Sequence, residues 1–280
     1  MSKRIIFHRM FHSNFFMIGV VTAAIIFILA VFAPYIVHYS PIANSLEDSL
    51  LAPQLFGGSH FFGTDQLGRD IFTRLLMGGR YSLTISVLVT VTSMALGTAL
   101  GIISGYFGKA IDTVIMRICD VFLSIPNMIL AIAVMAVLGT SVVNLVVVLI
   151  VVGWVQYCKV TRNNVLVIKN MDFTRASRVL GGSKSHIMFR QIFPNVTTQL
   201  IILFTFQIGD TIMLEASLSF LNLGIQPPLP SWGNMITDGR DYLATNPWLV
   251  LVPGIALMIT VLAFNFLGDG LRDVLDPQRT

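Results

Sequence analysis

The chain alternates between long runs of apolar residues and shorter polar intervals. An α-helix rises about 1.5 Å per residue, so about 20 apolar residues cross the roughly 30 Å hydrocarbon core of a bilayer. Six of the apolar runs approach or exceed this length, which predicts an all-α membrane protein with six transmembrane helices. The predicted spans cover residues 15–37, 81–107, 113–138, 142–157, 197–221 and 248–268.

The composition supports a membrane protein and excludes an ordinary soluble domain. Of the 280 residues, 55% are hydrophobic and only 11% are charged, and the mean hydropathy is +0.79. Basic residues precede the first apolar run, as they do in a secretory signal. That run is too long for a signal core, and no clear cleavage site follows it, so residues 15–37 are predicted to be a retained first span.

The distribution of Lys and Arg predicts the orientation of the spans. Cytoplasmic segments of membrane proteins carry an excess of these residues. With residues 1–14 in the cytoplasm, the segments 38–80 and 222–247 lie outside and the interval 159–195 lies inside. The inner segments then hold 14 Lys and Arg side chains, and the outer segments hold 4. We therefore expect both the N- and C-termini to be cytoplasmic.

The interval 159–195 is the most basic part of the chain, with a net charge of +6. A glycine pair interrupts its helical pattern and a proline closes it, which predicts two short helices joined at Gly181 with φ above zero. A basic loop can simply mark the cytoplasmic side, and a helix-turn-helix that reads DNA is disfavoured by the flanking spans. The apolar side chains within the loop favour a docking module for a cytoplasmic partner. Its candidate docking residues are Arg175, Ala176, Ser177, Gly181, Gly182, Ile187 and Pro194.

The fifth predicted span, 197–221, contains Gln207, Asp210 and Glu215. Two acids offset most of the free energy that the apolar residues gain in lipid, so this helix should face the bundle interior or an aqueous path. The acids are five residues apart, about 140° around a helix, and are not expected to form one site. These three residues are candidates for a translocation path. Two alternatives are a structural role, and proton carriage in an ion-coupled secondary transporter.

Two further features concern helix shape and packing. Gly97, Gly101 and Gly105 recur every four residues, which puts them on one helix face where another helix can approach closely. That contact is either static or a moving interface. Pro126 lies within the predicted span 113–138 and is expected to kink it.

The sequence contains no recognisable catalytic or nucleotide-binding motif. Gly108-Lys109 lacks the rest of a phosphate-binding loop, and the five histidines are scattered. Cys119 and Cys158 both fall near predicted cytoplasmic ends of spans, which argues against a disulfide framework, and their spacing is not that of metal ligands. We expect a non-catalytic chain that binds no metal, cofactor or nucleic acid.

One segment has a long and specific resemblance to known proteins. Residues 62–72 read Phe-Gly-Thr-Asp-Gln-Leu-Gly-Arg-Asp-Ile-Phe. This segment resembles the Gly-Thr-Asp-x-x-Gly-Arg-Asp motif of ABC-importer permeases in the dipeptide, oligopeptide and nickel transport family. The segments 218–233 and 265–273 are similar to that family's Pro-Pro…Trp-Gly loop and to its ending, with Asn222 in place of a common glycine.

The basic interval also resembles the cytoplasmic loop of those permeases. Ala176, Ser177, Gly181 and the end of the interval, residues 193–195, fall at matching positions, whereas Arg175 stands where the family pattern often has Glu. The resemblance covers nearly the whole chain and points to the C-subunit type. In that family this loop forms the coupling helix that seats in the ATPase subunit.

The resemblance implies a type I ABC-importer permease fold over residues 81–280 and a multi-pass location in the bacterial inner membrane. It implies a homologous permease as heterodimer partner, two ABC ATPases that bind ATP and Mg²⁺, and an extracytoplasmic solute-binding protein. The substrate it implies is a small peptide, with nickel or a metal chelate as the alternative. The sequence does not choose among dipeptide, oligopeptide, glutathione-like and nickel substrates.

Overall fold

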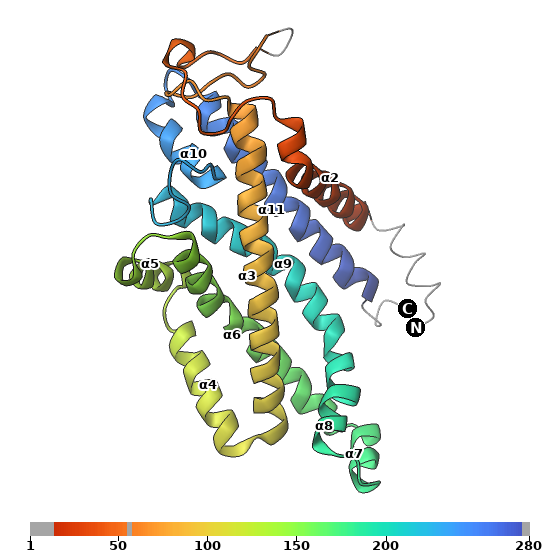
Figure 1. Ribbon diagram of the computed structural model, residues 1–280. Helices are drawn as coiled ribbons and strands as arrows, with labels where there is room; N and C mark the ends of the chain where they lie inside the picture. The colour runs from red at the N-terminus through yellow and green to blue at the C-terminus, as the bar shows by residue number, and fades with distance from the viewer. Residues whose placement is uncertain (1–13, 55–57, 276–280) are drawn as a thin grey trace.

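A computed structural model describes residues 14–54 and 58–275 (Figure 1). Apart from Asn14, the predicted N-terminal segment 1–14 lies outside the described residues. Helices dominate these residues, and only an isolated bridge between Thr64 and Asp70 has β geometry. The helices are α2 (Asn14–Ile36), η1 (Leu46–Asp48), α3 (Ile71–Phe107), α4 (Lys109–Leu123), α5 (Asn127–Leu138), α6 (Val142–Ile168), α7 (Asp172–Val179), α8 (Lys184–His186), η2 (Ile187–Ile192), α9 (Phe193–Phe220), α10 (Trp232–Gly239), η3 (Arg240–Tyr242) and α11 (Trp248–Leu275).

Several helices extend beyond the predicted spans. Helix α3 begins at Ile71 rather than at residue 81, because the Asp70 carboxylate caps it and accepts a hydrogen bond from the backbone N–H of Thr73 at 2.7 Å. Helix α6 continues through polar residues to Ile168, and α11 continues to Leu275. Hydropathy marks the part of a helix that lies in lipid, whereas the helix itself ends where its cap or a breaker stands.

The predicted third span, 113–138, is not one kinked helix. Helices α4 and α5 are separate and bent by 90° at a short break. Helix α4 ends at Leu123, and Pro126 stands at the N-cap of α5. Proline disfavours helical backbone in the residue before it and cannot donate a backbone hydrogen bond. The expectation of a kink was correct in position and too small in extent.

Helices α3 and α6 pack closely along most of their length, and the glycine face of α3 lies in this contact. A Cβ at Gly101 would come within 2.6 Å of the Cys158 carbonyl oxygen, and one at Gly105 within 2.7 Å of Val165 Cβ. At Gly97 a Cβ would meet Tyr157 Cβ at 2.6 Å. Side chains at these positions would therefore force the two helices apart.

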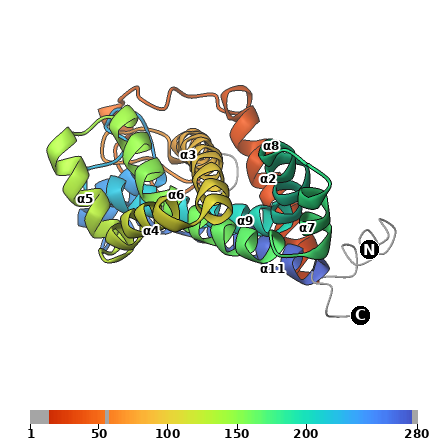
Figure 2. The same cartoon turned by 90° about the horizontal axis from the view of Figure 1, so that it is seen from below.

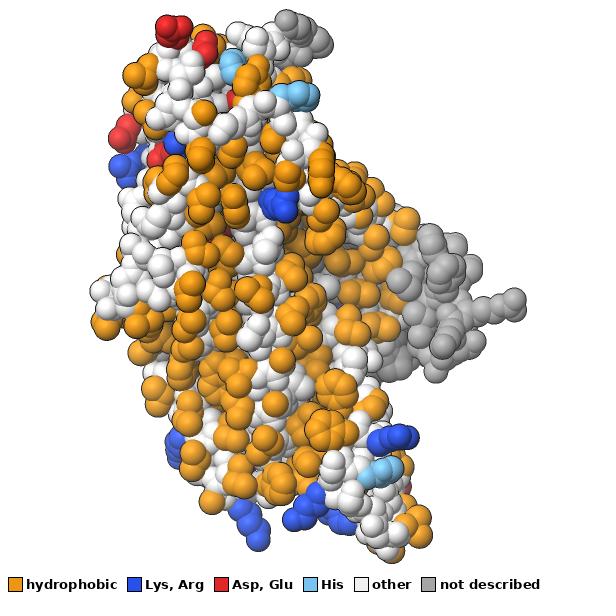
Figure 3. Space-filling view, in the orientation of Figure 1, with side chains coloured by type: hydrophobic (Ala, Val, Ile, Leu, Met, Phe, Trp, Pro, Cys, Tyr) orange, Lys and Arg blue, Asp and Glu red, His pale blue; other side chains and the backbone are white. Residues whose placement is uncertain are grey.

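The remaining helices arrange around this pair. Helix α2 lies beside α11 in both views, while α4 and α5 lie on the opposite side of the molecule (Figures 1 and 2). Among the described residues, five helices are long and apolar enough to cross a membrane, or six if α4 and α5 together count as one broken span. A broad apolar surface covers the middle of the molecule, between two ends that carry most of the visible charge (Figure 3).

Candidate functional site

One end of the molecule carries a cluster of Lys and Arg side chains around α7 and α8, and we call it the basic end (Figure 3). Helix α7 ends in a Schellman motif. The Gly182 N–H donates to the Ser177 carbonyl at 2.9 Å, and the Gly181 N–H donates to the Arg178 carbonyl at 3.2 Å. Gly181 has φ +84°, so the predicted left-handed turn is confirmed. A Cβ at Gly182 would lie 2.8 Å from the Ser177 carbonyl oxygen, which explains the second glycine.

The segment is fastened to the C-terminal ends of α3 and α6. Ile187 and Ile192 are fully buried in an apolar cluster with Val165 and Ile168 of α6. The Arg178 guanidinium lies 6.0 Å from the centre of the Tyr106 ring, and the Lys184 ammonium 5.7 Å from that of Phe107. Ile187 therefore anchors the segment and is not available to contact a docked partner.

The outer surface of the segment carries exposed apolar side chains. Val179 and Leu180 are each 86% exposed at the C-terminal end of α7, and Phe189 is 66% exposed on η2. We call these three residues the apolar tip. Arg175 and Ala176 are exposed on α7, Ser177 is half-buried, and Pro194 is exposed in the first turn of α9. An exposed apolar surface on an anchored, basic segment is typical of a protein-docking site.

A second candidate region lies within the membrane part of the molecule, where α5, α6 and α9 surround a cavity of about 270 Å³. Gln207 and Asp210 line it, together with Gln156 of α6 and Asn127 at the start of α5. The sequence predicted the first two. Gln156 stands alone in an otherwise apolar stretch of α6, and that isolation was a usable signal. Nothing in the sequence connected Asn127 with α9. Asn127 reaches the cavity only because the helix breaks at Pro126.

Glu215 lies elsewhere, at the contact between α3 and α9. Its side chain is fully buried and accepts hydrogen bonds from the hydroxyls of Ser82, at 2.8 Å, and Ser219, at 2.7 Å. The Ser219 hydroxyl oxygen in turn accepts the backbone N–H of Ile225 at 3.1 Å. The predicted separation of the two acids is confirmed, and the geometry around Glu215 fastens α3 to α9 instead of lining a cavity.

The end opposite the basic end holds a buried ion-pair network. The Arg69 guanidinium donates to the Asp65 carboxylate at 2.7 Å and lies 3.3 Å from Asp238 of α10. Arg74 lies 3.4 Å from each of the same two carboxylates. Burial raises the pKa of Asp238, while the positive charges of Arg74 and Arg69 oppose that change. The network ties the segment of the Gly-Thr-Asp motif to a helix far along the chain, a pairing that sequence reasoning missed.

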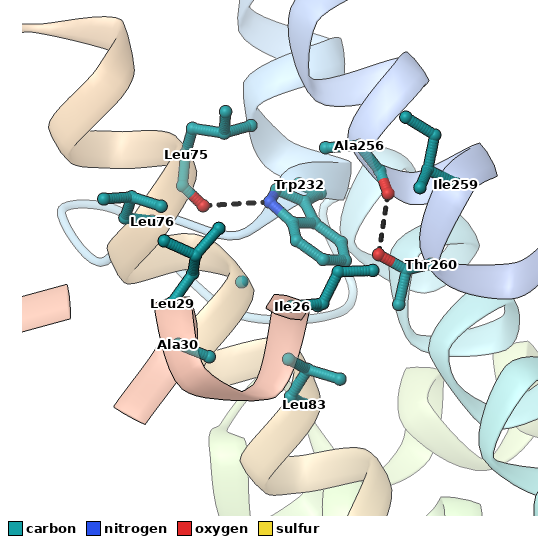
Figure 4. A pocket seen from close by; sticks show the side chains of 11 residues that line it. Ile26, Leu29, Ala30, Leu75, Leu76, Leu83, Trp232, Ala256, Ile259 and Thr260 are labelled. Atoms are coloured by element: carbon teal, nitrogen blue, oxygen red, sulfur yellow. Dashed lines mark hydrogen bonds between the residues drawn. The ribbon is translucent and has the colours of Figure 1, made fainter. Parts of the chain in front are cut away.

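Further contacts complete this end of the molecule. His60 Nδ1 lies 2.9 Å from the Asp70 carboxylate, and the Trp232 indole N–H donates to the Leu75 carbonyl at 3.0 Å. Beneath this indole lies an apolar cavity of about 190 Å³ between α2, α3 and α11 (Figure 4). Within the described residues, no group of three His, Cys, Asp or Glu side chains is placed to hold a metal ion.

Comparisons with family models and with known proteins point to the same family. Residues 97–280 match the family described as binding-protein-dependent transport system inner membrane component, and residues 3–53 match the N-terminal TM domain of oligopeptide transport permease C. The chain is 39% identical over 275 residues to the glutathione transport system permease protein GsiD of Pectobacterium atrosepticum, which covers 96% of this chain and 91% of that protein.

Two other relatives are similar over nearly their full length. The dipeptide transport system permease protein DppC of Haemophilus influenzae is 38% identical, covering 94% of this chain and 90% of that protein. The di/tripeptide transport system permease protein DppC of Pseudomonas aeruginosa is 39% identical, covering 93% and 87%. The chain belongs to the inner membrane components of binding-protein-dependent transport systems, which are the non-catalytic permease subunits of ABC importers.

Proposed function

We propose that this chain is one of two homologous membrane subunits of an ABC importer for dipeptides, other short peptides or glutathione-like solutes. The relatives described above are named for dipeptides, di- and tripeptides or glutathione, which favours this solute class over nickel chelates. Its further partners are two ABC ATPases, which would bind ATP and Mg²⁺, and an extracytoplasmic binding protein. Because the chain belongs to a family of ABC importers, we do not propose that it is an ion-coupled secondary transporter.

We also propose an orientation of the chain in the membrane. We place the basic end in the cytoplasm, with both chain termini on that side and the network of Asp65 and Asp238 outside. The basic side chains at α7 and α8 support this placement, because cytoplasmic segments are enriched in Lys and Arg. The membrane itself then surrounds the apolar middle of the molecule.

The observation that carries the proposal is the apolar tip on its anchored support. Ile187 and Ile192 fix the base of the segment, so a force on Val179 and Leu180 is transmitted to α6 and α9 instead of being lost in a flexible loop. This is the geometry that a coupling segment requires. ATP binding would favour one arrangement of the two ATPases, and the bias would reach the spans through this contact.

Gly181→Val tests the proposal. Non-glycine residues in left-handed backbone cost roughly 1–2 kcal/mol, and a branched residue costs more. Because a Cβ at Gly181 would meet no atom within 4 Å, the strain is confined to the turn. We expect the variant to assemble with the sister permease while losing most co-purifying ATPase and most ATP hydrolysis stimulated by the loaded binding protein. A second variant, Leu180→Ser, removes part of the apolar tip without backbone strain and should weaken docking in the same assay.

Gly139→Val is the matched control. Gly139 has φ +81°, and a Cβ there also meets no atom within 4 Å, but it lies in the turn between α5 and α6. The local cost is therefore similar, and the site is remote from the apolar tip. Full docking and full stimulation in both Gly181→Val and Leu180→Ser would contradict the proposal, as would an equal loss of docking in Gly139→Val.

A further inference from the structure

The cavity between α5, α6 and α9 has features of a solute-binding site. We propose that it recognises the positively charged α-amino group of the transported solute, with the Asp210 carboxylate as the counter-ion. This inference rests on the proposed function, since it assigns a chemical class to the solute that passes this chain. That class is a peptide or peptide-like zwitterion with a free α-ammonium group.

Apart from Asn127 of α5, the polar residues of the cavity come from α6 and α9, whose lining residues lie in regular register. Gln207, Asp210 and Ser217 recur at intervals of three and seven residues along α9, so they share one helix face. On α6, Leu149, Val152 and Gln156 follow the same rule. The two faces meet across the cavity, and the polar positions of each are turned toward it.

The hydrogen-bonding capacity of these side chains is unused. Gln207 is only 8% exposed, but its amide atoms are not fully enclosed, and no hydrogen bond joins them to any described residue. The carboxylate of Asp210 and the amide of Gln156 likewise have no hydrogen-bond or ion-pair partner within residues 14–54 and 58–275. Gln156 and Asp210 are exposed, so these groups are open to a ligand in the cavity. A peptide group supplies both the donors and the acceptors that two glutamine side chains lack.

The charge of the cavity selects a cation. Asp210 is its one ionisable side chain, and no Lys, Arg or His is among the described residues that line it. A carboxylate at membrane depth is unfavourable without a compensating charge. Glu215, the other acid of α9, is held by two serine hydroxyls and contributes nothing to this cavity. An ammonium group beside Asp210 would therefore gain a strong and unshared counter-ion.

The rest of the wall suits solutes with varied side chains. Met128 is 41% exposed and Met213 56% exposed, and both line the cavity. Methionine is flexible and adapts to different shapes, as at other surfaces that accept many ligands. The site thus combines a fixed charge for the group that all short peptides share with an adaptable surface for the groups in which they differ.

The test uses proteoliposomes that contain the complete complex of this chain, its sister permease, the two ATPases and the binding protein. Uptake of L-alanyl-L-alanine and of reduced glutathione is measured together with stimulated ATP hydrolysis. We expect Asp210→Asn to lower uptake of the probes about tenfold or more, because a charge pair loses one member. Asp210→Glu should retain most uptake. Stimulated hydrolysis is measured on the same vesicles, so that the change in uptake can be compared with the change in coupling.

Charge rescue distinguishes recognition from a structural role. In Asp210→Cys, a methanethiosulfonate reagent that adds a sulfonate should restore uptake, whereas one of similar size that adds a trimethylammonium group should not. The native Cys119 and Cys158 are fully buried, and the unsubstituted protein treated with each reagent is the control. Met213→Cys is the matched variant in the same cavity, where neither reagent should raise uptake.

The outcomes separate the two proposals. If the unsubstituted complex imports a probe and Asp210→Asn imports it equally well, the inference about Asp210 is wrong while the proposed function stands. The inference also fails if both reagents act alike on Asp210→Cys. If the unsubstituted complex imports neither probe, the proposed solute class is wrong, and the inference is overturned with it.

Discussion

Helix α9 presents two acids, five residues apart, to two regions of opposite character. At the contact with α3, Glu215 is fully buried and both of its oxygens accept serine hydroxyls. At the cavity, Asp210 is exposed and has no partner among the described residues. The two acids cost similar free energy to place in a membrane. Only the surroundings separate a residue that holds helices together from one that is free to bind.

The difference shows how polar residues on the membrane helices should be interpreted in this protein. In a satisfied network, as at Glu215 or at Asp65, the polar groups are already paired within the folded chain and have no hydrogen-bonding capacity left for a ligand. An unpaired group, as at Asp210 or Gln207, keeps its hydrogen-bonding capacity for a ligand. We call the first kind of region closed and the second open. The following substitutions compare closed and open positions directly.

The largest loss of stability is expected in the ion-pair network at the end of the molecule opposite the basic end. Asp65→Asn removes the carboxylate that two buried guanidiniums, Arg69 and Arg74, share. Breaking a buried ion pair by removing one partner costs roughly 3–5 kcal/mol, so the free energy of unfolding should fall by about that amount. The measurement is thermal unfolding of the purified complex in detergent. Asp241→Asn, at the exposed pair with Arg240, is the control and should change stability by less than about 1 kcal/mol.

The next effect compares the two acids themselves. Glu215→Leu leaves the hydroxyls of Ser82 and Ser219 without their acceptor and should lower the free energy of unfolding by about 2–4 kcal/mol. Asp210→Leu removes an unpaired charge and should leave that quantity unchanged or slightly raised. The readout is the fraction of monodisperse complex after a heat challenge.

A double-mutant cycle sharpens this result. Adding Ser82→Ala to Glu215→Leu removes one of the stranded donors, so the double variant should be less destabilised than the sum of the single changes. Equal stability of Glu215→Leu and Asp210→Leu would show that the distinction between closed and open regions has no energetic basis.

The smallest effect concerns shape instead of charge. Gly101→Ala places a methyl group within 2.6 Å of the Cys158 carbonyl oxygen, which should cost roughly 1–3 kcal/mol by overpacking α3 against α6. Gly254→Ala adds the same group where no atom lies within 4 Å, so it should be neutral or slightly stabilising because alanine favours a helix. Chemical unfolding monitored by tryptophan fluorescence would rank the two variants. Indistinguishable unfolding curves would indicate that α3 and α6 can separate freely.

Much of the architecture is determined by local rules that act along the sequence. Apolar runs of span length place the membrane helices, because lipid offers no partner to an exposed backbone group. The glycine at 181 takes the left-handed conformation because residues with a Cβ resist it. The spacing of Asp210 and Glu215 places them on different helix faces, since a helix turns 100° per residue.

The tertiary structure alone decides which polar groups meet. Asp65 and Asp238 share two arginines across more than half of the chain, and Asn127 reaches the cavity of Asp210 only because the helix breaks by 90° before it. Ile187 is an apolar residue in a basic loop, for which the sequence predicted an exposed docking position, but its side chain is buried. Periodicity reports the face of a helix on which a residue lies, whereas the partner of that face depends on how the other helices pack. The sequence therefore determined five of the six spans and the turn at Gly181, and packing decided which acids are closed by partners and which remain open to a ligand.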